Sequence, residues 1–318
     1  MNAIRSAMKN CVLAVVLAAC AACNGPDEGA VSEHKGSGES AAAQRGGPAD
    51  TTPVEVFETK HYAIATTATS EQTQAIGAAV ESLHRAYSAF FAKALAAQGE
   101  PGRLQLRLYR DRGEFVAHNR SMPWAEAYYR APICHAYYSG GGQNPYHWMV
   151  HEATHQLNHE VAGFKNQRWM NEGLATYFGA SRIENGVLHP GSIDATAYPI
   201  WWLDRIPLSG DLGRDIEQRR WIPLRDLLAD TGPEIGRYLN LYYVEYWSLS
   251  HFLFHYRDGQ YAQGYRAVIR EGGSVEAFER RIGPIERVQQ EWYGYLRDRQ
   301  AEAAAPPKTD AWFVPAGG

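Results

Sequence analysis

The segment HEATH at residues 151–155 constrains the fold of this 318-residue chain more than any other sequence feature. Histidines four positions apart lie one turn apart on one face of an α-helix, where both imidazoles can reach the same small ligand. Just upstream, Asn144 and Pro145 predict the helix start, with Asn144 at the N-cap and Pro145 at the first helical position. We therefore expect a helix from residue 145 to about Glu160.

The paired histidines, His151 and His155, are typical zinc ligands, because zinc accepts imidazole nitrogen at roughly 2.0 to 2.1 Å. A catalytic zinc site takes a third protein ligand and leaves its fourth position to water. Zinc lowers the pKa of that water towards about 7, and Glu152 can then take its proton as general base while the water attacks a carbonyl. Such a short motif also occurs by chance, so its surroundings must support it.

The segment WMNEGLA at residues 169–175 contains a candidate third ligand, Glu172. Its amphipathic pattern predicts a second helix. Residues 162–166 are typical of a turn, which would let the second helix fold back antiparallel to the first. Glu172 would then face His151 and His155.

These two segments resemble the gluzincin branch of the zincin metallopeptidases, in which an HExxH helix is paired with a glutamate ligand in an Asn-Glu-Gly motif on the next helix. The strings WMNEGLATYF and YYVEYWSLSHFL are also similar to bacterial peptidase-MA-like proteins, many of them predicted hydrolases. The resemblance covers residues 54–296 and is strongest over residues 146–178.

The resemblance implies a role for each matching residue. The implied ligands of Zn²⁺ are His151, His155 and Glu172. Glu152 would be the general base, and Asn171 would help to orient the ligands. The metzincin branch instead needs a glycine and a histidine at the two positions where this chain has Asn158 and Val161, which excludes that branch.

Gluzincins also use a Tyr or His from a later helix to stabilise the oxyanion, because a donor aimed at developing charge lowers the barrier. Tyr243, Tyr246 and His251 lie on the helix predicted over residues 234–256, and we favour Tyr243 as this catalytic donor. The alternative is that these aromatic side chains are the core of a helical lobe.

Four further residues near the motif have alternative interpretations. His147 lies one turn before the histidine pair and His159 one turn after it, so either could be an alternative metal ligand. Otherwise His147 is a polar residue in the wall of the cleft, and His159 is solvated or orients its neighbours. Because Cys134 lies beside His135, one interpretation of Cys134 is a catalytic nucleophile. Neighbours in an extended segment point to opposite faces, which favours Cys134 as a small buried side chain.

The wider pattern predicts an α+β fold. The resemblance implies a zincin-like subdomain over residues 53–190, in which a small mixed sheet packs on the HExxH helix. A long helix should begin at Thr69, which forms a capping-box pattern with Gln72, and should end at residues 99–102. Strands are expected near residues 54–64, 104–108 and 131–139. Residues 133–139 are either an exposed edge to which a peptide adds or an internal strand.

A mainly helical subdomain is expected over residues 191–300. Its predicted helices lie at residues 224–229, 234–256, 261–270 and 285–299.

The N-terminus predicts export. Residues 1–19 have the basic start and short apolar stretch of a signal peptide. The stretch ends in LAAC, which resembles the lipobox of bacterial lipoproteins. A lipid on Cys20 would then anchor the mature chain to the bacterial cell envelope membrane. Cys23 is a second candidate for the lipid, and the alternative is an ordinary signal-peptide cleavage site. Residues 20–52 are predicted to be a disordered tether, and residues 301–318 a flexible tail.

Composition limits the partners. A formal net charge of −4 creates no strong field, so nucleic acid is not an expected partner. We expect a monomeric, zinc-dependent metallopeptidase that hydrolyses a peptide or protein substrate. The alternatives are an envelope scaffold that binds zinc without proteolysis and a zinc amidase that acts on a cell-wall or other amide.

Overall fold

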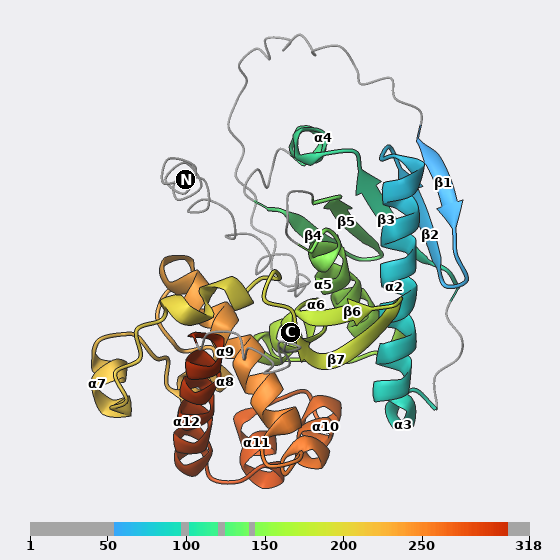
Figure 1. The fold of residues 1–318 in the computed structure, drawn as a ribbon. Coiled ribbons are helices and arrows are strands. Elements are labelled where there is room, and N and C mark those ends of the chain that lie inside the picture. The colour runs from blue at the N-terminus through green and yellow to red at the C-terminus, as the bar shows by residue number, and fades with distance from the viewer. Residues whose placement is uncertain (1–53, 97–101, 120–124, 140–143, 305–318) are drawn as a thin grey trace, which may run out of the picture. The chain divides into compact units, whose positions relative to one another are not determined.

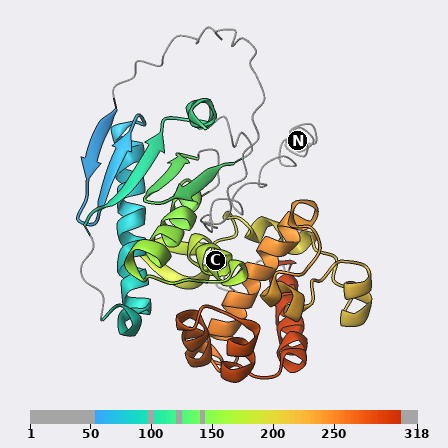
Figure 2. The same cartoon turned by 180° about the vertical axis from the view of Figure 1, so that it is seen from behind.

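The computed structural model describes residues 54–96, 102–119, 125–139 and 144–304 (Figures 1 and 2). The predicted signal peptide, Cys20, the tether and the tail beyond residue 304 lie outside the described residues. The chain divides into two compact units, the first extending to Val161 with Asn185–Val187 and the second comprising Ala162–Glu184 and the chain from Leu188 onwards. None of the helices in the described ranges combines the length and apolar character that crossing a bilayer requires.

The first unit is built on a five-stranded mixed sheet in the order β1-β2-β3-β5-β4. Its strands are β1 (Glu55–Glu58), β2 (Tyr62–Thr66), β3 (Leu104–Tyr109), β4 (Ala127–Arg130) and β5 (Ile133–Tyr137). The three inner strands β2, β3 and β5 are parallel, whereas β1 and β4 pair antiparallel at the two edges. The predicted mixed sheet is therefore confirmed.

Helices α2 (Ser70–Phe90) and α5 (His147–Gln156) pack against this sheet and against each other. The strands alternate between buried and less buried residues, and Ile64, Leu106 and Cys134 are at most 1% exposed. Short helices α3 (Ala92–Leu95) and α4 (Arg112–His118) follow α2 and β3. Helix α5, which carries the HExxH motif, is thus held in place by its packing against the sheet and α2 in the core of the first unit.

The expectation that residues 133–139 form an exposed edge is wrong. β5 lies between β3 and β4, with Cys134 paired to Leu106 on one side and to Tyr129 on the other. Strand β4 was not predicted, and a turn at residues 131–132 folds it back onto β5. β4 therefore takes the edge position.

The predicted capping box at the start of α2 is confirmed, and α4 also has a side-chain N-cap. Thr69 is the N-cap of α2, and its reciprocal hydrogen bonds with Gln72 complete the capping box. Asp111 caps α4 by accepting the backbone N–H of Glu114 at 2.8 Å. The long helix ends at Phe90, earlier than expected.

The HExxH helix itself begins later than predicted. Its N-cap is Tyr146, and Asn144 instead accepts the backbone N–H of Tyr146 at 3.1 Å in a turn that precedes the helix. After Gln156 the chain continues as a π-helical turn, η1 (Leu157–Val161), in which the buried Asn158 accepts a hydrogen bond from Tyr87 Oη at 2.8 Å. The helical conformation thus extends to Val161, with a wider last turn.

The second unit is mainly helical, and the helical C-terminal region that was expected over residues 191–300 lies within it. Its helices are α6 (Arg168–Gly179), η2 (Ile200–Arg205), α7 (Leu212–Glu217), α8 (Leu224–Ala229), α9 (Ile235–His255), α10 (Ala262–Arg270), α11 (Val275–Arg281) and α12 (Ile285–Ala304). Helices α8, α9, α10 and α12 were predicted nearly to their ends, whereas α7, α11 and the hairpin of β6 (Ser181–Glu184) and β7 (Val187–Ile193) were not. Buried Trp169, Tyr265 and Phe278 pack together in its core.

Candidate metal centre

Helix α5 brings its two histidines together as the spacing predicts. The Nε2 atoms of His151 and His155 lie 3.2 Å apart, and the two rings meet edge to face with centroids 4.9 Å apart. Both residues are at most 5% exposed. Two buried imidazole nitrogens that converge on one point are arranged to share a ligand.

The sheet holds α5 through a side chain at the end of the helix. Gln156 is fully buried, and its Nε2 donates to the backbone oxygens of Gln105 at 3.0 Å and Pro132 at 2.6 Å. These bonds connect the residue after His155 to β3 and to the turn between β4 and β5. These long-range contacts fix the orientation of the α5 face that carries His151 and His155. No sequence pattern predicted them.

Glu172 on α6 completes the group. One nitrogen from each of His151 and His155 and one carboxylate oxygen of Glu172 all lie within 4.8 Å of one another. Glu172 is 1% exposed. Two imidazole nitrogens and a carboxylate oxygen form a donor set that suits a first-row divalent metal ion.

Local contacts in the second unit hold the start of α6. Trp169 Nε1 donates to the backbone oxygen of Gly273 at 3.0 Å, and the Gln167 N–H donates to Gly272 O at 3.1 Å. The backbone oxygen of Glu172 accepts Thr176 Oγ1 at 2.7 Å. Hydrogen bonds therefore hold helix α6 both before Glu172, at Gln167 and Trp169, and after it, at Thr176.

Glu152 and Cys134 are close enough to interact electrostatically. Burial raises the pKa of the Cys134 thiol well above its usual value, and the carboxylates of Glu152 and Glu160 raise it further. Cys134 is fully buried, as predicted, and its thiol stays protonated. Glu152 is 4% exposed on the same helix as both histidines.

The flanking histidines differ from each other. His147 is 2% exposed and its Nδ1 lies 2.5 Å from the backbone oxygen of Asn144. The side chain of His159 is 63% exposed, and its Nδ1 lies 3.2 Å from Tyr129 Oη. Neither belongs to the group of converging ligand atoms, so the alternative ligand sets find no support among the described residues.

The oxyanion candidates on α9 are all buried. His251 has both ring nitrogens engaged inside the second unit, Nδ1 at 2.7 Å from Tyr295 Oη and Nε2 at 2.9 Å from the backbone oxygen of Gly191. It is therefore a poor donor for a substrate. Tyr243 is 2% exposed and packs against the ring of Tyr198, with centroids 5.3 Å apart. Its catalytic role, like that of Tyr246, stays a prediction.

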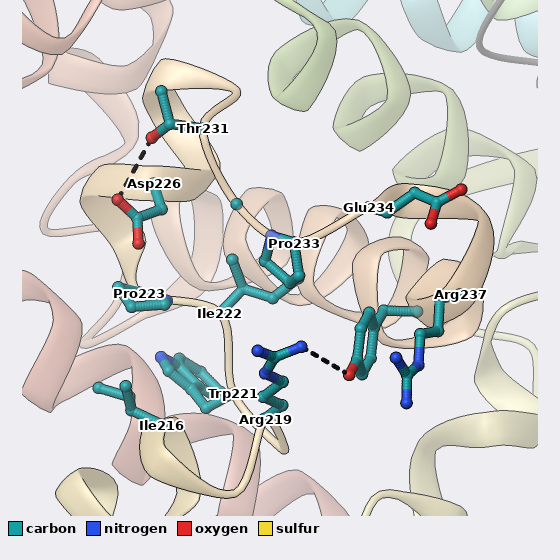
Figure 3. Close-up of a pocket in the computed structure, with 12 residues that line it drawn as sticks. Ile216, Arg219, Trp221, Ile222, Pro223, Asp226, Thr231, Pro233, Glu234 and Arg237 are labelled. Atoms are coloured by element: carbon teal, nitrogen blue, oxygen red, sulfur yellow. Dashed lines mark hydrogen bonds between the residues drawn. The ribbon is translucent and has the colours of Figure 1, made fainter.

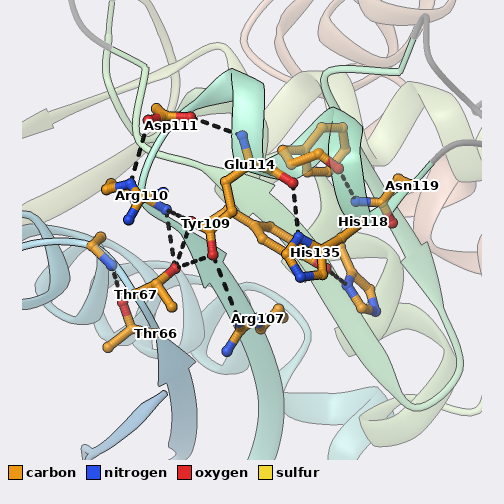
Figure 4. A network of polar contacts seen from close by, with 12 residues as sticks. Thr66, Thr67, Arg107, Tyr109, Arg110, Asp111, Glu114, His118, Asn119 and His135 are labelled. Atoms are coloured by element: carbon orange, nitrogen blue, oxygen red, sulfur yellow. Dashed lines mark hydrogen bonds and ion pairs between the residues drawn. The ribbon is translucent and has the colours of Figure 1, made fainter. Parts of the chain in front are cut away.

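His135 belongs to a separate polar network beside β3 (Figure 4). Its Nδ1 lies 3.1 Å from Tyr109 Oη, and burial lowers the pKa of its imidazole to about 4. In the same view the buried Glu114 carboxylate accepts Thr67 Oγ1 at 2.7 Å and the Arg110 N–H at 2.8 Å. The contacts of Glu114 connect α4 to the sheet. Cys134 and His135 are neighbours in β5, so their side chains lie on opposite faces of the sheet.

A pocket of 510 Å³ lies in the second unit, between the segment before α8 and the start of α9 (Figure 3). Its charged lining residues are Arg219, Asp226, Glu234 and Arg237. Arg219 donates to Tyr238 Oη at 3.4 Å. The two guanidinium groups and two carboxylates give this lining no net formal charge, and the lining contains none of the residues of the metal centre.

A scan against models of known protein families matches none, and a search of curated proteins finds no match either.

Proposed function

We propose that this chain is a zinc-dependent metallopeptidase of the zincin type, with His151, His155 and Glu172 as the metal ligands. The observation that supports the proposal is the convergence of two imidazoles from α5 and one carboxylate from α6, whose ligand atoms lie within 4.8 Å of one another. Helix α5 also carries Glu152. A purely structural zinc site closes its fourth position with another protein ligand and needs no acid or base beside it. Within the described part of the chain the converging group has three ligand atoms, and the Glu152 carboxylate lies next to His151 in the sequence.

When bound, zinc supplies a Lewis acid that polarises the scissile carbonyl and lowers the pKa of water. In our proposal the Glu152 carboxylate accepts a proton from the water whose oxygen attacks the carbonyl carbon. Glu152 then gives that proton to the amine nitrogen as the C–N bond breaks. His151 and His155 would hold the metal through ring nitrogens that carry no proton, and Glu172 would hold it through a carboxylate oxygen.

The proposed substrate is a peptide or protein. We propose β4 as the strand to which an extended peptide adds, because β4, and not β5, is the strand at that edge of the sheet in the described part of the chain. Tyr243 is proposed as the donor to the oxyanion.

We also propose that the protein is exported and anchored by a lipid on Cys20. This proposal rests on the sequence of residues 1–20. Fractionation of cells that express the wild type and Cys20→Ala tests it. The wild type should sediment with membranes and the variant should not, whereas membrane association of both would contradict a lipid on Cys20.

The metal and the chemistry are tested together by metal analysis and a peptide-library digest read by mass spectrometry. The wild type should contain about one zinc per chain, and His151→Ala and Glu172→Ala should lose it. Glu152→Gln should keep the metal and lower turnover by about 10²- to 10⁴-fold. His159→Ala is the matched control, because this exposed histidine shares the helical row and should change neither quantity.

The outcomes separate the alternatives. Zinc that is unaffected by His151→Ala and Glu172→Ala would contradict the metal centre. Zinc binding with equal, background turnover of every peptide by the wild type and Glu152→Gln would instead indicate a scaffold or an amidase.

A further inference from the structure

Helices α6 and α9 pack against each other at Gly173, the residue next to Glu172. A Cβ atom built at Gly173 would lie 2.4 Å from Ser250 Oγ and 3.0 Å from the backbone oxygen of Tyr246. Both distances are shorter than ordinary van der Waals contact. The glycine is therefore required by the closeness of the two helices, because its own backbone is in ordinary helical conformation.

The groups facing Gly173 cannot move away easily. Ser250 is fully buried, and its hydroxyl is 2.8 Å from the hydroxyl of Tyr265, which is also fully buried. Rotation of Ser250 would break this hydrogen bond inside the core. The Tyr246 oxygen is part of the α9 backbone, so it can yield only if the helix itself shifts.

A side chain at residue 173 would therefore displace α6 from α9 and would carry Glu172 with it. Thr176 donates to the backbone oxygens of both Glu172 and Gly173, which makes this turn of α6 move as a unit. Metal–oxygen bonds tolerate only small changes, since a carboxylate binds zinc at roughly 2.0 to 2.2 Å.

We infer that Gly173 is a positioning residue for the metal centre: its missing side chain lets α6 approach Ser250 and Tyr246 closely enough to place the Glu172 carboxylate beside His151 and His155. This inference rests on the proposed function, in which Glu172 is a metal ligand. It assigns the glycine of the Asn-Glu-Gly segment a role that is separate from any contact with metal or substrate.

The test compares Gly173→Ala, Ser250→Ala and the double variant in the full chain. Zinc affinity is measured by competition with a chelator, ligand geometry by the visible absorption of the Co²⁺-substituted protein, and stability by thermal unfolding in EDTA. Gly173→Ala should weaken zinc binding by about 10- to 100-fold, the range for loss of a group that orients a ligand, and should change the Co²⁺ spectrum. Ser250→Ala alone should bind zinc as the wild type does.

The double variant should recover most of the lost affinity, because removal of Ser250 Oγ relieves the shorter of the two clashes. The matched control is Gly294→Ala on α12, where a Cβ would meet nothing within 4 Å. It should leave zinc affinity and the Co²⁺ spectrum unchanged. If Gly173→Ala alone does not fold, the double variant decides the question by the same two measurements.

Unchanged affinity and spectrum in Gly173→Ala would overturn the inference while leaving the metal centre intact. Loss of affinity without recovery in the double variant would also overturn it, since the effect would not come from this contact. If the wild type binds no zinc, the proposed function fails and the inference fails with it; a His151→Ala sample in the same series distinguishes the two cases.

Discussion

Buried polar side chains dominate the site at the residue scale. His151, Glu152, His155 and Glu172 are each at most 5% exposed. Burying such groups is costly unless they are paired, hydrogen-bonded or coordinate a metal. A metal ion held by His151, His155 and Glu172 would offset part of that cost. Cys134 shows the opposite case, a nucleophilic residue type that burial has made inert.

His251 provides a pH-dependent test at the same scale. Burial lowers the pKa of its imidazole to about 4, and nearby His255 and Arg299 lower it further, while the hydrogen bond to Gly191 opposes them. Tyr295 and Tyr177 face it from α12 and α6. The folded state therefore binds the proton less well than the unfolded state, whose histidine pKa is about 6.5. Stability should be unaffected above pH 6.5 and should fall as the pH drops from 6.5 towards 4.

We expect this histidine to cost about 2 kcal/mol of unfolding free energy between pH 7 and pH 5. Urea unfolding in EDTA at both pH values should show a smaller loss for His251→Gln than for the wild type. Equal losses in the two proteins would show that His251 does not carry a depressed pKa.

At the scale of elements, the position of α5 depends on one buried amide. Gln156 Nε2 bridges two backbone oxygens that belong to β3 and to the β4–β5 turn. We expect Gln156→Leu to lower the free energy of unfolding by about 1 to 3 kcal/mol, because both bonds are lost in a buried site. Chemical denaturation in EDTA measures this change. Gln218→Leu on the surface is the control and should stay within about 0.5 kcal/mol of the wild type; a similar loss in both variants would contradict the bridging role.

Helix α2 offers a second test at this scale. Its capping box satisfies the N–H groups of both Thr69 and Gln72. Thr69→Ala should destabilise the protein by about 1 kcal/mol, whereas Thr69→Asp should retain most of the cap. Equal stability of the alanine and aspartate variants in denaturant unfolding would mean that the cap contributes little.

For the whole molecule, a bound metal should stabilise the fold by mass action. Zinc at about 100 times its dissociation constant should add about 2.7 kcal/mol to the free energy of unfolding. The melting temperature of the wild type should rise on addition of zinc to EDTA-treated protein. His151→Ala should show no such rise, and an equal rise in both proteins would place the stabilising metal elsewhere.

Local patterns in the sequence were enough to predict several elements of this protein. The capping box at Thr69, helix α9 and the helical spacing of His151 and His155 all depend on residues within a few positions of one another. Propensity, capping and amphipathic periodicity act over that range, so they can be read without knowledge of the fold. His151 and His155 were identified from the sequence for the same reason, whereas Glu172 was identified through a predicted turn, a second helix and the resemblance to gluzincins.

The tertiary structure alone decided the remaining features. Strand β5 is internal because β4 folds back onto it, and both nitrogens of His251 are engaged because Gly191 and Tyr295 come to it from distant parts of the chain. The requirement for glycine at residue 173 appears only when α9 is packed against α6. These features depend on which atoms meet across long sequence separations, and close packing, rather than any local preference, determines which atoms meet.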